Sequence, residues 1–376
     1  MKTVIACDSF KGSLSAREVC RSLENGIKSV CPDVSVQSFP LADGGEGTVE
    51  SFYGICGGRL VKAQTVNCFF EPITAEYLLL NEHTAVIETA AASGITNVPT
   101  ERLNPMTAST FGTGLLIKDA VANGADEIIL GLGGSATNDG GTGVLNALGI
   151  DFLDGNGNVL SPTGENLIKI KDFSVREGFA DYRSIKFTLA CDVENVFCGK
   201  MGAAFVFARQ KGADDSMITA LDRGLESFAS LIRDKVGIDL KTVSGAGAAG
   251  GLGGGMLALL DCEIKSGFNV LASFSDIEAA VAQADLVITG EGKTDSQTAC
   301  GKLPYRVSML ARKYNKPCVL VCGQLDISAD LNVLGFTAAY ELTDGGVETA
   351  RAIAEAGKLL TQKGRLIAKK HINKKD

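Results

Sequence analysis

The chain has 376 residues, 45% of them hydrophobic and 21% charged, so it can bury a large core and is long enough for two ordinary domains. Its formal net charge is -8 and no basic stretch precedes the last few residues, which argues against nucleic-acid binding. No apolar run reaches the roughly 18 residues that a membrane span needs. The scattered cysteines, with no signal peptide, predict reduced thiols and a cytoplasmic protein.

The N-terminal region predicts a strand, a loop and a helix, followed by a second strand. Residues 2–7 form a short apolar run that stops at Asp8. Ser15 and Glu18 have the spacing of a capping box, so a helix is expected to begin there. The next strand, residues 34–39, runs into a glycine-rich segment, Pro40-Leu41-Ala42-Asp43-Gly44-Gly45-Glu46-Gly47-Thr48.

The middle of the chain has a different pattern. Residues 59–92 resemble antiparallel strands, and a later strand, residues 127–130, leads into a second glycine-rich run, Gly131 to Gly143. The apolar residues 203–208 predict a strand flanked by Lys200 and Lys211, whose side chains we expect to be solvated. A third glycine cluster, Gly245 to Gly255, precedes an apolar helix.

From about residue 276, short apolar strands and helices alternate as they do near the N-terminus, and a closing helix is expected at 350–360. Buried strands separated by helices are typical of a parallel sheet. We therefore predict an α/β protein with two domains. Residues 1–60 plus 276–376 would form a doubly wound domain, and residues 61–275 a mixed α/β domain inserted into it.

Three acidic residues occupy equivalent places in this pattern. Asp8, Asp43 and Asp192 each stand at or just after the end of a predicted strand. Parallel sheets bind ligands beyond the carboxyl ends of their strands. A carboxylate there can hold Mg²⁺ or accept a proton from an attacking hydroxyl, so these three aspartates are candidate catalytic residues.

The run Gly131 to Gly143 is open to two interpretations. Successive backbone N–H groups ahead of a helix form an anion site, which suits a phosphate. The same residues also fit the dinucleotide fingerprint G-x-G-x-x-A, with Asp151 about twenty residues farther on, and the third cluster fits G-x-G-x-x-G. Six glycines in thirteen positions, continued by polar Thr137, Asn138 and Asp139, favour phosphate binding. A dehydrogenase remains an alternative.

Other familiar chemistries do not fit the sequence. Gly292-Lys293-Thr294 could end a P-loop, but Val287 stands where its first glycine belongs. The chain has two histidines, His83 and His371, both expected at the surface. Lys11, Lys293 and Lys302 lie beside glycine-rich or acidic segments and could neutralise an anion, while Glu291 and Asp295 could bind Mg²⁺.

Taken together, the motifs resemble the bacterial glycerate kinases of the type-1 family over essentially the whole chain. The resemblance rests on Asp8-Ser9-Phe10-Lys11-Gly12-Ser13, Ala42 to Thr48, Gly131 to Gly141, Cys191-Asp192-Val193-Glu194-Asn195, Gln210-Lys211-Gly212-Ala213, Gly245 to Gly253, and Gly290-Glu291-Gly292 with Asp295 and Gln297. The chain departs from the family pattern at Cys7, Val196 and Ala208, none of which removes a charged or hydroxyl group.

The resemblance implies an ATP-dependent kinase that phosphorylates D-glycerate with Mg²⁺, usually at the 2-hydroxyl, which gives 2-phospho-D-glycerate. It also implies two α/β domains, one of them flavodoxin-like. The expected partners are the small-molecule substrate and a nucleotide. A non-catalytic ligand-sensing protein of the same fold and an NAD-dependent oxidoreductase are the rival hypotheses.

The predicted roles follow from these motifs, because phosphoryl transfer needs positioning and charge neutralisation above all. Asp192 or Asp43 would accept the hydroxyl proton, Lys11 would stabilise the transferring phosphoryl, and Asp192, Glu291 and Asp295 would hold Mg²⁺. The predicted substrate- and phosphate-binding residues are Asp8, Ser9, Lys11, Gly44, Gly45, Glu46, Gly133, Gly134, Ser135, Asn138, Asp139, Asn195 and Lys302.

Overall fold

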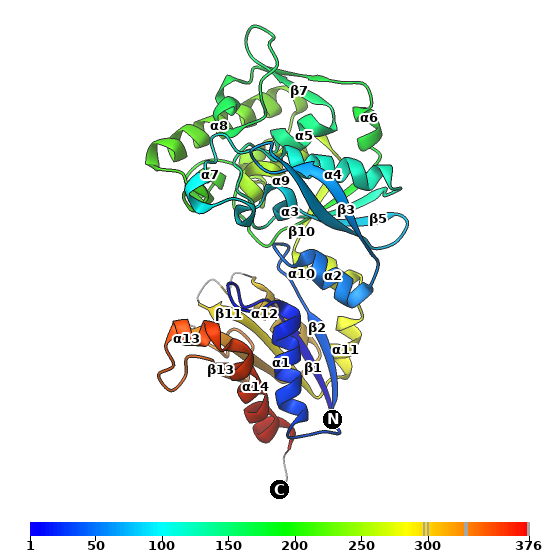
Figure 1. Cartoon of the computed structure of the whole chain (residues 1–376), viewed down its shortest axis with the longest axis vertical. Helices are drawn as coiled ribbons and strands as arrows, with labels where there is room; N and C mark the ends of the chain where they lie inside the picture. Colours follow the sequence, from blue (N-terminus) through cyan, green and yellow to red (C-terminus); the bar gives the residue numbers. More distant parts are fainter. Residues whose placement is uncertain (296–297, 299–300, 327–329, 374–376) are drawn as a thin grey trace. The chain divides into compact units, whose positions relative to one another are not determined.

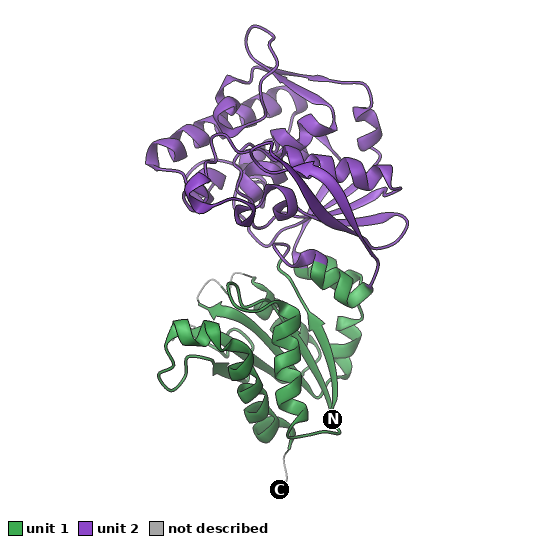
Figure 2. Cartoon of the chain, viewed as in Figure 1, with its two compact units in different colours: residues 1–43, 50–56, 268–376 green, residues 44–49, 57–267 purple. Residues whose placement is uncertain are grey.

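The computed structural model describes residues 1–295, 298, 301–326 and 330–373. The chain divides into two compact units (Figure 2). Residues 1–43, 50–56 and 268–376 form the first unit, and residues 44–49 and 57–267 form the second. From the sequence we expected boundaries after residues 60 and 275. In the structure the segment 44–49 already belongs to the second unit, so Asp43 and Gly44 lie in different units.

A five-stranded parallel sheet forms the centre of the first unit (Figure 1), in the spatial order β13-β12-β11-β1-β2. Numbered within this unit alone, the order is 2-1-3-4-5, which is that of flavodoxin-like doubly wound sheets. The predicted fold class is therefore confirmed. The strands are β1 (Lys2–Cys7), β2 (Ser35–Pro40), β11 (Leu286–Thr294), β12 (Cys318–Leu325) and β13 (Ala338–Glu341).

Helices cover this sheet, and the first of them shows how the sequence specifies the fold. Helix α1 (Ala16–Lys28) begins at the predicted capping box of Ser15 and Glu18. Its buried apolar face packs against α14 (Ala356–Ile367), where Gly26 and Gly364 allow the two backbones to approach closely. The buried aliphatic side chains of such a face each stabilise the fold by about 1.5–3 kcal/mol. The other helices of this part of the chain are α2 (Thr48–Cys56), α10 (Gly267–Ser273), α11 (Ile277–Gln283), α12 (Leu303–Lys313) and α13 (Thr349–Ala354).

The second unit contains a six-stranded mixed sheet, in the order β10-β9-β6-β5-β4-β3. Its first four strands run parallel, whereas β4 and β3 complete it as antiparallel neighbours, as the sequence predicts for residues 59–92. The strands are β3 (Arg59–Val66), β4 (Pro72–Leu79), β5 (Thr84–Glu88), β6 (Glu127–Gly131), β9 (Lys186–Ala190) and β10 (Cys262–Lys265). A separate hairpin pairs β7 (Ile150–Leu153) with β8 (Asp172–Val175).

Several helices surround this sheet and enclose an aromatic core, in which the rings of Phe152 and Phe228 lie 5.7 Å apart in an edge-to-face contact. The helices are α3 (Thr89–Ser93), α4 (Phe111–Ala122), α5 (Thr142–Leu148), α6 (Phe179–Tyr182), α7 (Ala203–Phe207), α8 (Asp215–Val236) and α9 (Ala248–Leu259), and a short 3-10 helix spans Arg209–Lys211. The four parallel strands end on one edge of this sheet, which becomes important for the site.

Three predicted elements differ from the structure. The strand expected at 203–208 is the short helix α7, because a run of five or six apolar residues does not distinguish a strand from a buried helix. The third glycine cluster continues into helix α9 instead of only preceding it, with Ala249, Gly250 and Gly251 in left-handed conformations. The single closing helix expected at 350–360 is divided into α13 and α14 at Glu355.

Candidate active site

The order of strands in the first unit indicates where a ligand binds. The order in which the chain adds strands to this sheet reverses between β1 and β11, and doubly wound sheets bind their ligands beyond the carboxyl ends of the strands at such a switch point. Asp8 directly follows β1, and its backbone N–H donates to the carbonyl of Gly290 at 2.9 Å. Glu291 is the next residue of β11. The fold therefore brings the predicted residues Asp8 and Glu291 to the same edge of the sheet.

Asp8 is a buried carboxyl in an acidic environment. Burial, with smaller effects from the nearby charges of Asp43 and Glu291, raises its pKa to about 7, against the opposing effect of Lys11. Its Oδ1 accepts hydrogen bonds from the N–H of Ser9 at 2.6 Å and from the Ser9 hydroxyl at 3.3 Å. Asp8 can therefore exchange a proton near neutral pH.

Lys11 and Asp43 form an ion pair beside Asp8. The Lys11 ammonium lies 3.1 Å from Oδ2 of Asp43, and the charge of Asp43 raises the pKa of Lys11. The Lys11 side chain is 75% exposed, so the pair adds little to stability and its ammonium is accessible to an anion. These two predicted catalytic residues are thus brought together within the first unit.

Glu291 and Asp295 have separate partners in the same unit. Glu291 Oε1 accepts the hydroxyls of Thr294 at 2.9 Å and Thr298 at 2.8 Å, while burial raises the pKa of Glu291. Asp295 pairs with Lys302, the N-cap residue of α12, at 3.3 Å. Gln297, part of the same motif, lies outside the described residues.

In the second unit the segment 44–49 lies against the carboxyl ends of β6 and β9. The carbonyl of Gly44 accepts the N–H of Gly133 at 3.2 Å, and a Cβ at Gly44 would lie only 2.7 Å from the carbonyl oxygen of Ala190. A Cβ at Gly133 would likewise collide with Gly45. Only glycine fits these positions, so the predicted residues Gly44, Gly45 and Gly133 form one closely packed group.

Glu88, at the carboxyl end of β5, is a residue that the sequence analysis did not select. Its Oε1 accepts the N–H of Val49 at 2.7 Å, and it also accepts hydrogen bonds from the N–H groups of Gly47 and Thr48. Burial, with a smaller effect from the charge of Glu46, raises the pKa of Glu88 to about 7. Glu88 thereby fixes the segment that carries the predicted residue Glu46.

The loop from Leu132 to Gly141 connects β6 to α5 and is almost fully buried. Asp139 holds it in place, because its carboxylate accepts the N–H and hydroxyl of Thr110 at 2.7 and 2.8 Å and the N–H groups of Gly141 and Gly143 at 3.1 Å each. The predicted residue Asp139 therefore organises the loop with its own carboxylate. Ser135 and Asn138 lie on the same loop.

The third glycine cluster packs directly on this loop. The N–H of Gly140 donates to the carbonyl of Gly250 at 3.0 Å, and a Cβ at Gly250 would collide with the carbonyl oxygen of Thr137. A Cβ at Gly255 would collide with the carbonyl oxygen of Gly140. Close contact between two backbones therefore explains why Gly250 and Gly255 are glycines.

The structure overturns one expectation about charge. Lys211, expected to be solvated, is 2% exposed. Its ammonium donates to the Ser135 hydroxyl at 2.9 Å and to the Thr137 carbonyl at 2.7 Å. The sequence signal was present in the motif Gln210-Lys211-Gly212-Ala213, but the charge of a lysine is ordinarily a reason to expect exposure.

Asp192 and Asn195 follow β9 in the second unit. Asn195 is held by a hydrogen bond from its side-chain amide to the carbonyl of Met201 at 2.9 Å, and its own carbonyl accepts the N–H of Gly247 at 2.9 Å. Glu291 and Asp295, proposed with Asp192 as metal ligands, belong to the first unit. Within the described ranges of the chain, no group of three or more His, Cys, Asp or Glu side chains has metal-binding geometry.

The dinucleotide fingerprint does not have its expected geometry. In that motif the glycine-rich turn opens directly into the helix. Here Ala136 pairs through its N–H with the carbonyl of Ser93, and α5 begins only at Thr142. The second match, Gly245 to Gly250, follows a short 3-10 helix, Leu240–Thr242, instead of a strand. The loop geometry therefore does not support the NAD-binding alternative.

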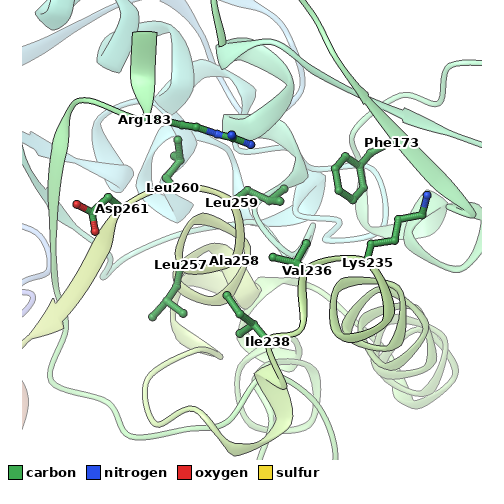
Figure 3. Close-up of a pocket in the computed structure, with 10 residues that line it drawn as sticks. All are labelled: Phe173, Arg183, Lys235, Val236, Ile238, Leu257, Ala258, Leu259, Leu260 and Asp261. Carbon is green, nitrogen blue, oxygen red and sulfur yellow. The ribbon is translucent and has the colours of Figure 1, made fainter. Parts of the chain in front are cut away.

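A groove of about 670 Å³ lies elsewhere in the second unit (Figure 3). Its walls are mostly apolar and come largely from the C-terminal parts of α8 and α9. At its rim Lys235 pairs with Asp172 at 2.6 Å. The lining residues are Phe173, Arg183, Lys235, Val236, Ile238, Leu257, Ala258, Leu259, Leu260 and Asp261, and none of the predicted site residues is among them.

Comparisons with known proteins give one consistent result. A model of the glycerate kinase family matches residues 3–371. The chain is 41% identical to a glycerate kinase of Bacillus subtilis (strain 168), over 98% of this chain and 97% of that protein, and 42% identical to a glycerate 2-kinase of Escherichia coli (strain K12), over 86% of each. The crystal structure assigned to glycerate kinase 2 from Salmonella typhimurium LT2 superposes with a TM-score of 0.83, at 38% identity and 98% coverage of this chain. Among the described residues, no helix is long and apolar enough to cross a membrane.

Proposed function

The chain belongs to the glycerate kinase family, a family of enzymes that phosphorylate glycerate, and we propose that it transfers the γ-phosphoryl group of ATP to D-glycerate to give 2-phospho-D-glycerate. The observation that carries the finer part of this proposal is the 42% identity to a relative named as a glycerate 2-kinase. The proposal is also supported by the carboxyl and ammonium groups at the switch point of the first unit and by the buried glycine-rich loop of the second.

The proposed substrate-binding group in the first unit consists of Asp8, Ser9, Lys11 and Asp43. The exposed ammonium of Lys11 can neutralise the carboxylate of glycerate or the transferring phosphoryl group. Asp43 and Asp192 remain the proposed bases, and Asp8 joins them because a carboxyl with a pKa of about 7 can accept a proton at neutral pH. In the second unit, Gly44, Gly45 and Glu46, with Asn195, remain proposed ligand-binding residues.

The residues present also fit Mg²⁺. Burial is the main cause of the raised pKa of Asp8, and the nearby negative charges of Asp43 and Glu291 add to it. A divalent cation would relieve this concentration of negative charge. Mg²⁺ is normally held by one or two carboxylates together with substrate phosphates, so no larger cluster is required. We propose Glu291 and Asp295 as its ligands in the first unit and keep Asp192 as a candidate in the second. When bound, the ion would neutralise phosphate charge.

We propose that the loop containing Gly133, Gly134, Ser135 and Asn138 binds nucleotide phosphates. The side-chain amide of Asn138 and the hydroxyl of Thr137 are buried and have no hydrogen-bond partner within the described part of the chain. Such groups are costly to bury alone. Phosphate oxygens could accept from the Asn138 amide N–H₂ and the Thr137 hydroxyl, and bound water could donate to the Asn138 amide oxygen. Lys302, at the N-cap of α12, remains a proposed phosphate-binding residue of the first unit.

The decisive experiment measures ADP formation when D-glycerate is added to the enzyme with MgATP. We expect ADP release that requires glycerate, and direct conversion of the product by enolase, which accepts 2-phosphoglycerate but not 3-phosphoglycerate. Product that needs a phosphoglycerate mutase first would overturn the assignment to the 2-hydroxyl. Absence of ADP would favour the ligand-sensing alternative.

We place the reaction in the cytoplasm. This agrees with the cysteines of the described ranges, all of which are free thiols.

A further inference from the structure

Lys211 is a buried lysine in contact with the loop to which the proposed function assigns the nucleotide phosphates. Its ammonium donates one hydrogen bond to the hydroxyl of Ser135 and one to the carbonyl of Thr137. The lysine is 2% exposed, and Ser135 and Thr137 are buried as well. Lys211 therefore holds two residues of the loop from inside the protein.

The local backbone fixes Lys211 in this position. The 3-10 helix Arg209–Lys211 ends at Gly212, which has a left-handed φ of +94°. A Cβ at Gly212 would also collide with the carbonyl oxygen of Leu103. The turn after Lys211 thus tolerates only glycine, and it directs the lysine side chain inward.

The charge of this ammonium is poorly balanced in the protein alone. The charge of Asp139 favours the ammonium, whereas its two hydrogen-bond acceptors, the Ser135 hydroxyl and the Thr137 carbonyl, are neutral. The carboxylate of Asp139 is already occupied by Thr110, Gly141 and Gly143. Desolvation accordingly lowers the pKa of Lys211 to about 7, despite the favourable effect of Asp139.

We propose that Lys211 is a positioning residue that takes up a proton when the loop binds the phosphates of a nucleotide, so that its ammonium becomes the buried counter-charge of the bound anion. This inference rests on the proposed function. The reaction is the conversion of the lysine amine and one proton from solvent into an ammonium. A negative charge near the loop favours the charged lysine, and the charged lysine in turn favours the anion.

Proton uptake is the measurement that tests this inference. Binding of MgADP to the whole enzyme is followed by calorimetry at pH 8 in two buffers of different ionisation enthalpy. With a pKa of about 7, the free lysine is mostly neutral at this pH. We expect the wild type to take up roughly 0.5–1 proton more per MgADP than Lys211→Met, and the variant to bind MgADP at least about tenfold more weakly at pH 7. A purely structural role of Lys211 would not change proton uptake.

The matched control is Lys186→Met. It removes an exposed lysine at the N-terminal end of β9, whereas the candidate site lies at the carboxyl ends of the strands. This variant should retain both the affinity and the proton uptake of the wild type. Equal proton uptake by wild type and Lys211→Met, or equal affinity, would overturn the proposal.

Two further arms keep the result decisive. If Lys211→Met does not fold, the wild type itself is tested, because its affinity for MgADP should weaken steadily between pH 7 and pH 9. An affinity independent of pH would contradict the proposal. Turnover of D-glycerate is measured in parallel. Turnover without proton linkage rejects only the role of Lys211, whereas a protein that neither binds MgADP nor turns over glycerate rejects the proposed function and this inference together.

Discussion

We propose that single residues at the strand ends carry the chemistry of this protein, and Asp192 is the one whose proposed role is simplest to test. It follows β9 in the second unit and is a proposed base or metal ligand. Replacing it with asparagine keeps its shape and removes its negative charge. We expect Asp192→Asn to lower kcat by about 100-fold or more, because general-base catalysis contributes about that much, with an unchanged denaturation midpoint.

The control for this prediction is Asp181→Asn, which changes an exposed aspartate of α6 in the same unit. It should leave both turnover and stability near their wild-type values. Turnover of Asp192→Asn within a factor of about three of the wild type would remove Asp192 from the mechanism.

The environment of another single residue, Glu88, can be tested through the pH dependence of the protein's stability. Its pKa is raised from the usual 4.5 to about 7 by burial, so the native carboxyl keeps its proton to higher pH than the unfolded one. Its contribution to stability is therefore greatest below pH 4.5 and is lost as the pH rises through 7. Glu88→Gln does not titrate. Relative to the wild type, this variant should gain about 1–3 kcal/mol of unfolding free energy between pH 4.5 and pH 8.

Urea titrations at the two pH values measure this difference, and Glu82→Gln, which changes an exposed residue of a neighbouring loop, is the control. A Glu88→Gln variant whose stability relative to the wild type is the same at both pH values would show that the Glu88 carboxyl titrates normally.

At the level of elements, the contact between α9 and the loop 132–141 supports the proposed phosphate site. Gly250, in the first turn of α9, has a φ of +71°, and a Cβ there would strike the carbonyl of Thr137, which accepts the Lys211 ammonium. Gly250→Ala should therefore destabilise the enzyme by about 2–4 kcal/mol, since it adds a collision to the backbone strain. It should also weaken MgADP binding, because the loop must move.

The matched control for Gly250→Ala is Gly237→Ala, at the end of another helix. Gly237 ends α8 with a φ of +84°, but no atom lies within 4 Å of a Cβ placed there. This substitution adds the same backbone strain without a collision. We therefore expect it to lower the unfolding free energy by about 1–2 kcal/mol and to leave the MgADP affinity unchanged. Similar losses of stability and affinity in the two variants would mean that contact with the loop is unimportant.

The order of strands and helices also explains which site residues could be predicted from the sequence and which could not. The rule that ligand-binding carboxylates follow parallel strands selects Asp8 and Asp43, which the structure brings together with Lys11. Glu88 obeys the same rule, but its strand follows two antiparallel ones, so its parallel pairing with β6 was hidden. Lys211 was missed because its burial depends on tertiary packing around Gly212, which no local pattern records.

For the whole molecule, three desolvated groups make the free energy of unfolding depend on pH, in opposite directions on the two sides of pH 7. Asp8 and Glu88 have pKa values raised to about 7, so the native state holds more protons than the unfolded chain between about pH 4 and pH 7, and stability falls as the pH rises through that range. Lys211 has a pKa lowered to about 7, so above pH 7 the unfolded chain holds more protons and stability rises with pH.

These contributions predict that the unfolding free energy of the enzyme without ligands has a minimum near pH 7. Denaturant titrations at pH 5.5, 7 and 8.5 should show it lower at pH 7 than at either side by about 1–3 kcal/mol. Lys211→Met should remove the rise above pH 7, and Glu88→Gln should reduce the fall below it. A maximum of stability at pH 7 would contradict this account. Asp8 and Lys211 belong to the groups proposed to meet substrate, Mg²⁺ or nucleotide, whereas Glu88 does not. Saturating MgADP should therefore flatten the part of the profile that Asp8 and Lys211 produce, by balancing their charges.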